Sequence, residues 1–88
     1  MINTKKLSQA LKEHTKKEII SRGPDEILIN GMLIKFRGNL LLCDKASFRF
    51  EHIKELLLQL RIENFLDLDD KSISHVANRY RHLMNNKQ

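Results

Sequence analysis

Residues 26–35, EILINGMLIK, carry the strongest signal for the fold. The pair Asn30-Gly31 separates two short apolar runs, over residues 27–29 and 32–34. This pattern is typical of a two-residue type I′ hairpin turn, because both central residues of that turn take a positive φ. The turn also fixes the register, so we expect residue 29 to pair with 32, 28 with 33, 27 with 34, and Glu26 with Lys35.

The residues that follow this hairpin predict a third strand. Arg37-Gly38-Asn39 offers a second turn, and an apolar run comes directly after it. We therefore expect a small antiparallel meander with strands over residues 26–30, 32–37 and 39–43. Both faces of this sheet carry apolar side chains, so C-terminal helices should cover one face. The first helix or a second protein chain should cover at least part of the other face.

A helix over residues 4–22 is predicted before the sheet. Asn3 or Thr4 can cap its N-terminus, and Gly23-Pro24 is a suitable stop. Its apolar stripe is thin, and its polar side contains three lysines that can hold phosphates: Lys5, Lys12 and Lys16. A merely solubilising surface is the alternative interpretation of these lysines.

A second helix is predicted over residues 47–64, with Ser47 as its N-cap. Apolar residues at helical spacing form its core stripe, namely Phe50, Ile53, Leu56, Leu57 and Leu60. Phe48 and Leu58 fall outside this stripe. They are candidates for a dimer contact, and a second layer of the core is the alternative.

The last predicted helix, over residues 70–85, separates its apolar and polar residues most clearly. Asp69 or Asp70 can cap it. One side buries apolar residues at helical spacing, namely Ile73, Val76, Ala77, Tyr80, Leu83 and Met84. The other side contains no carboxylate and consists of Lys71, Ser74, His75, Asn78, Arg79, Arg81, His82 and Asn85. Arginine and asparagine can contact base edges, and the lysine, serine and histidines can hold phosphates.

The helix over residues 70–85 and the one before it resemble a helix-turn-helix pair, over about residues 52–84. The resemblance implies that the last helix is a DNA recognition helix. The sequence departs from that family in the link over residues 65–70, which is longer than the usual three- or four-residue turn and contains no glycine.

Composition bounds the size and the partners of the protein. The chain has 88 residues and a formal net charge of +5. This length predicts one small α+β domain over residues 1–88, with an N-terminal helix, an antiparallel meander, and two C-terminal helices packed on the sheet. Basic residues are in excess over residues 1–22 and 71–88, and acidic residues over 44–70. A basic balance favours nucleic acid or another polyanion as the partner.

Targeting signals and cysteines indicate the compartment. No apolar run approaches the length of a membrane span, and no signal peptide is visible, so we expect a cytoplasmic protein without a membrane partner. The single cysteine, Cys43, excludes an internal disulfide and a cysteine-based zinc site. Its simplest role is that of a small buried apolar residue.

Catalytic motifs are lacking in the sequence, so we expect no enzyme, no cofactor and no metal. His75 and His82 are separated by about 10.5 Å of helical rise, too far to share a metal directly. The aspartate after Cys43 opposes formation of a reactive thiolate. A metal-assisted nuclease that uses Asp67, Asp69 and Asp70 is a minor alternative, since helix capping also explains these carboxylates.

The function predicted from these features is that of a small regulatory or accessory protein that binds nucleic acid, with DNA favoured over RNA, as a homodimer. The basic terminal helices would contact phosphates. The alternative is a protein-interaction module, such as a small inhibitor or adaptor, that binds a partner protein through its apolar sheet or an exposed strand edge.

Overall fold

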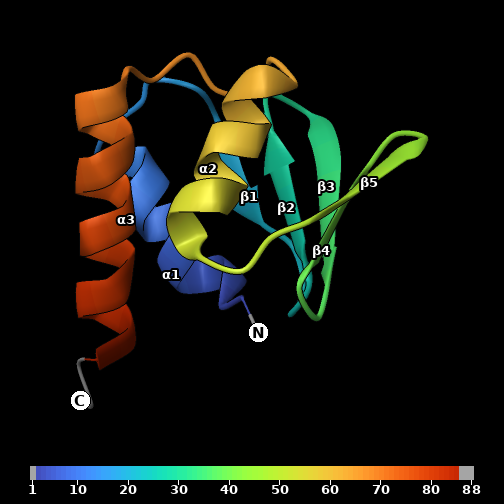
Figure 1. The fold of residues 1–88 in the computed structure, drawn as a ribbon, viewed down its shortest axis with the longest axis horizontal. Helices are drawn as coiled ribbons and strands as arrows, with labels where there is room; N and C mark the ends of the chain where they lie inside the picture. Colours follow the sequence, from blue (N-terminus) through green and yellow to red (C-terminus); the bar gives the residue numbers. More distant parts are fainter. Residues whose placement is uncertain (1, 86–88) are drawn as a thin grey trace.

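A computed structural model describes residues 2–85 of the chain. Within these residues, three helices and five strands follow one another (Figure 1). Their order is α1 (Thr4–Lys12), β1 (Ile19–Ser21), β2 (Glu26–Ile29), β3 (Met32–Arg37), β4 (Leu40–Cys43), β5 (Ala46–Arg49), α2 (Ile53–Ile62) and α3 (Asp70–Asn85). The strands form one antiparallel meander in the order β1-β2-β3-β4-β5, so the predicted α+β class is confirmed.

The central hairpin has the predicted turn and register. Asn30 and Gly31 have φ values of 49° and 80°, in the left-handed region that a type I′ turn requires. Ile29 pairs with Met32, and Glu26 with Lys35, whose charged atoms lie 3.4 Å apart. The second predicted turn, at Gly38, is also present and joins β3 to β4.

The N-terminal helix is shorter than predicted. It ends at Lys12 rather than at residue 22, and Ile19 belongs to strand β1, where it pairs with Ile29. The prediction was wrong because Ile19 and Ile20 lie off the apolar stripe of the helix, and their branched side chains pack well in a sheet. Gly23, with φ 74°, belongs to the turn between β1 and β2 instead of stopping a helix.

The second helix starts later than predicted. Ser47 is not its N-cap but part of strand β5, where it pairs with Leu42. A tight turn at Asp44, with φ 50°, returns the chain onto β4 and makes a fifth strand out of residues that also fit a helix. Helix α2 begins after His52, and the carboxylate of Glu55 accepts a hydrogen bond from the His52 backbone N–H at 3.2 Å.

All three helices lie on one side of the sheet (Figure 1). The buried strand residues share one face, as the register shows for Ile27, Ile34 and Cys43. Helix α3 packs mainly on α1 and α2, so it forms an outer layer away from the sheet. Of the two predicted covers for the second face, the first helix or a second protein chain, α1 is not the cover, because it lies beside β1 on the same side as the other helices.

The link between α2 and α3 differs from that of a helix-turn-helix. The link spans residues 63–69, which is longer than the usual three- or four-residue turn, and in Figure 1 the chain runs along α2 and α3 in opposite senses. Leu66 and Leu68 of the link are buried in the core. The end of α2 is tied to the start of α3 by Arg61, whose Nη1 lies 2.7 Å from Oδ1 of Asp70. These contacts produce an antiparallel helical hairpin.

Phe48 and Leu58 are both partly buried and pack against the core. Of the two interpretations of these residues, a dimer contact or a second layer of the core, the structure therefore supports the second layer of the core.

Candidate nucleic-acid interface

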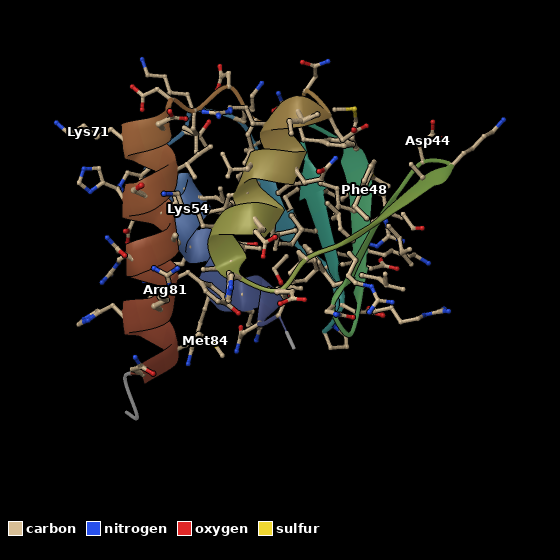
Figure 2. All side chains as sticks on the ribbon, in the orientation of Figure 1. Asp44, Phe48, Lys54, Lys71, Arg81 and Met84 are labelled. Atoms are coloured by element: carbon tan, nitrogen blue, oxygen red, sulfur yellow. The ribbon has the colours of Figure 1, made fainter. Side chains whose placement is uncertain are left out.

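The outward side of α3 is the candidate site, and we call it the polar surface of α3. It consists of the exposed residues Lys71, His75, Asn78, Arg81, His82 and Asn85, with the partly buried Ser74 beside them. The 16 residues of α3 make this surface about 24 Å long. Figure 2 shows Lys71 pointing away from the sheet near one end of α3, and Arg81 near the other end. The surface is accessible because α3 buries its apolar side on α1 and α2.

Arg81 and Asn78 form a hydrogen-bonded pair within this surface. The Nη1 of Arg81 donates to Oδ1 of Asn78 at 3.0 Å. This bond holds the guanidinium close to the helix, and it occupies one of five donors on the arginine. The pair therefore presents mainly N–H groups to solvent, which suits phosphate oxygens and the O6 and N7 acceptors of guanine.

Arg79 forms an ion pair with another side chain of the same chain. Its Nε donates to Oε1 of Glu13 at 2.9 Å, and both side chains are about one-third exposed. This ion pair joins α3 to the end of α1. Among the ion pairs within residues 2–85, Arg79 is thus the predicted nucleic-acid contact whose charge the fold neutralises.

His75 contacts a histidine from a different segment. Its ring stacks on that of His14, with the ring centroids 6.0 Å apart and the planes 8° from parallel. The Nδ1 of His14 is hydrogen-bonded to the carbonyl oxygen of Ala10 at 3.1 Å, so Nδ1 is the donor. This contact brings together residues 61 positions apart in the chain, and no spacing rule in the sequence could have indicated it.

The N-terminal end of α3 is acidic, and each carboxylate there has a structural role. Oδ1 of Asp69 accepts a hydrogen bond from the Ser72 backbone N–H at 2.8 Å, which confirms the predicted capping role. Hydrogen bonds from the backbone and side chain of Ser72 lower the pKa of Asp69. Asp70 pairs with Arg61. Repulsion of phosphates is therefore strongest at this end, where Lys71 is the exposed cation of the polar surface, and it is weakest from His75 to Asn85.

The lysines of the N-terminal segment lie elsewhere. Lys5 and Lys12 line a shallow hollow of about 450 Å³ together with Ser21 of β1. Lys16 lines another hollow, of about 380 Å³, beside Asn30 and Asp67. The structure thus places these three predicted phosphate contacts toward the strands and the hairpin turn.

The thiol of Cys43 and the possible metal ligands are considered next. Cys43 is buried, and this burial, followed by the carboxylates of Glu63 and Asp44, raises the pKa of its thiol. In the part of the chain that the structure describes, no three His, Cys, Asp or Glu side chains are grouped as a metal ion would require.

No helix within residues 2–85 is long and apolar enough to cross a membrane.

Comparisons of this chain with protein families, curated proteins and solved structures found no match.

Proposed function

We propose that the protein binds nucleic acid, with double-stranded DNA as the preferred class, through the polar surface of α3. The observation that carries this proposal is the exposed stretch from His75 to Asn85, which contains Asn78, Arg81 and His82 and no carboxylate. Its donors suit phosphates and guanine edges. We assign the protein an accessory or regulatory role without catalysis of its own.

The shape of the surface favours DNA over RNA. A single helix whose outer side is free along its length fits the major groove of B-form DNA, which is about 12 Å wide. The major groove of A-form RNA is too narrow and deep for side chains to read. Four groups of α3 can contact phosphates, namely Lys71, His75, Arg81 and His82. Lys71 and Arg81 carry the formal positive charges of this surface at pH 7, so we expect the logarithm of the affinity to fall with the logarithm of the salt concentration with a slope of roughly −2.

The test is a titration of labelled double-stranded DNA, single-stranded DNA and RNA over a salt series. The variant Lys71→Gln with Arg81→Gln removes two charges from the polar surface of α3. Its matched control, Arg37→Gln with Arg49→Gln, removes two charges from exposed strand residues. We expect the α3 variant to bind DNA about tenfold or more weakly and to reduce the salt slope by about 2.

The control variant should bind as the wild-type protein does. Equal losses in both variants would indicate a general charge effect and would contradict the proposed site. Absence of binding near physiological salt would reject the function itself.

The homodimer is a prediction that light scattering can check. Phe48 and Leu58 contribute to the core within one chain, so their exposed remainder offers little area for a stable interface.

A further inference from the structure

The second face of the sheet is left without a covering layer. Within residues 2–85, all three helices lie on the side of the opposite face, on which the buried strand residues gather, and α3 is the outer layer there. The register places five aliphatic side chains on the uncovered face: Ile20, Leu28, Leu33, Leu40 and Leu42. Ile20 is 43% exposed and Leu33 37% exposed. We call these five residues, with the charged residues described next, the open sheet face.

Basic side chains surround this aliphatic centre. Lys35 pairs across the strands with Leu42, Arg37 with Leu40, and Arg49 also with Leu40, so these cations lie on the same face as the leucines. Arg22 lies there too, because its Nε is 3.4 Å from Oε1 of Glu26.

Glu26 is the carboxylate among these strand residues, and it already pairs with two cations. Glu26 is paired with both Arg22 and Lys35, each at 3.4 Å. Arg37 and Arg49 are exposed, and the described part of the chain offers them no ion pair. The open sheet face is therefore apolar in its centre and cationic at its border.

The shape of the molecule makes this region concave. The β4–β5 hairpin projects away from the body, with Asp44 at its tip (Figures 1 and 2). A hollow of about 1110 Å³ lies at its base. Leu33, Lys35 and Leu42 of the open sheet face line one part of it, and residues of the covered side and the hairpin line the rest, namely Met32, Cys43, Asp44, Lys45, Ala46, Ser47, Glu63 and Phe65. A chain segment that lies across the sheet could place apolar side chains in this hollow.

We propose that the open sheet face binds an acidic, apolar segment of a partner protein. Aliphatic or aromatic side chains of the segment contact Leu28, Leu33 and Leu42, and its carboxylates pair with Arg37 and Arg49. Charge complementarity selects this occupant, because only an acidic partner compensates the unpaired cations. The proposal concerns a different surface from the polar surface of α3 and does not depend on nucleic-acid binding.

Two other occupants fit less well. A second copy of the chain in a symmetric dimer would bring the same cationic borders together, and the like charges would repel. Single-stranded nucleic acid binds to sheets largely by stacking bases on aromatic side chains. The open sheet face has none, since Phe36 and Phe48 point to the covered face.

The test uses the full chain and a displayed library of random peptides of about eight residues, a length that can cross five strands about 4.8 Å apart. Selection should enrich peptides that combine Asp or Glu with Leu, Ile or Phe. The best peptide is then synthesised and titrated into the isotopically labelled protein. Its amide chemical-shift changes should map to β2, β3 and β4.

Matched variants locate the site. The double variant Arg37→Gln, Arg49→Gln should bind the peptide about fivefold or more weakly than the wild-type protein, since two ion pairs with the peptide are lost. The control, Lys71→Gln with Arg81→Gln, should leave its affinity unchanged. Leu33→Ser should weaken it as well, and circular dichroism should show that each variant remains folded.

Several outcomes would overturn the proposal. These are no enrichment of any peptide, enrichment of basic peptides, shift changes confined to α3, or a dimer that Leu33→Ser dissociates. Loss of DNA binding in the Arg37→Gln, Arg49→Gln variant alone, and not in the α3 variant, would assign the open sheet face to nucleic acid instead. Failure of DNA binding in the wild-type protein would leave this proposal unaffected, so the two functions fail separately.

Discussion

At the scale of single residues, Tyr80 joins the two ends of the described chain. Its ring is buried, and its hydroxyl oxygen accepts a hydrogen bond from the Asn3 backbone N–H at 2.9 Å. Asn3 in turn caps α1, because its Oδ1 accepts from the Lys6 N–H at 3.0 Å. One phenol thus positions the helix on which α3 rests.

Replacement Tyr80→Phe should lower the free energy of unfolding by about 1 kcal/mol, because the Asn3 N–H loses its partner. Urea denaturation at neutral pH measures this difference. Burial raises the pKa of Tyr80 above its ordinary value in the folded protein. The stabilisation by the neutral phenol is therefore complete below the unfolded pKa of about 10 and is lost as the pH rises through the folded value. The difference between the two proteins should consequently shrink in strongly alkaline solution, and a constant difference would contradict this account.

Ser8 and Ser21 differ in the hydrogen bonding of their hydroxyl groups, and this difference can be tested. The Oγ of Ser8 is buried and finds no hydrogen-bond partner within residues 2–85, whereas the Oγ of Ser21 donates to Oγ1 of Thr4 at 2.9 Å. Ser8→Ala should raise the free energy of unfolding by about 0.5–1 kcal/mol, since it removes an unsatisfied polar group and favours the helix. Ser21→Ala should lower it by a similar amount. Equal effects of the two substitutions in urea denaturation would be inconsistent with this assignment.

At the scale of elements, the N-terminus of α3 depends on Asp69. Hydrogen bonds from Ser72 favour the charged carboxylate and lower its pKa in the folded protein. Asp69→Ala should lower the midpoint of thermal unfolding at pH 7, because the first turn of α3 loses its cap. Asp67→Ala, which changes an exposed carboxylate nearby, is the control and should have little effect.

This cap contribution should depend on pH with a definite sign. A carboxylate with a lowered folded pKa stabilises the protein above its unfolded pKa of about 4, and this stabilisation is lost as the pH falls through the folded value. The thermal midpoints of the wild-type protein and Asp69→Ala should therefore approach each other at about pH 2–3. A gap that widens in acid would show that Asp69 acts in another way.

At the scale of the whole molecule, the two proposed surfaces lie on opposite sides. The helices separate the polar surface of α3 from the open sheet face in a molecule that measures 36 × 25 × 23 Å. Electrostatic interactions in solution decay over about 8 Å at physiological salt. Ligands on the two sides should therefore influence each other only weakly.

We expect DNA and the acidic peptide to bind at the same time. With saturating DNA, the dissociation constant of the peptide should change by less than about twofold at physiological salt. Fluorescence anisotropy of the labelled peptide measures this change. Displacement of the peptide by DNA would show that both ligands use one surface.

The elements that the sequence predicted well are those with local signals. The Asn30-Gly31 turn requires a positive φ, which its two residues supply, so the hairpin and its register followed from adjacent residues. Helix α3 followed in the same way from sixteen residues of consistent spacing and an aspartate before them. The outward side of α3 was likewise visible in advance, because burial of one side of a helix determines which residues lie opposite.

Strands β1 and β5, in contrast, were decided by tertiary structure. Residues 19–21 and 46–49 lie in stretches that the sequence also allows to be helical, and they become strands because β2 and β4 offer them unsatisfied backbone groups at the sheet edges. The partners of Arg79 and His75 were also decided there, since Glu13 and His14 reach them only when α1 packs on α3. Local sequence thus determined the hairpin, the last helix and its polar side. Long-range packing decided where the first two helices begin or end, which charges remain free, and which face of the sheet stays open, because these depend on contacts between residues far apart in the chain.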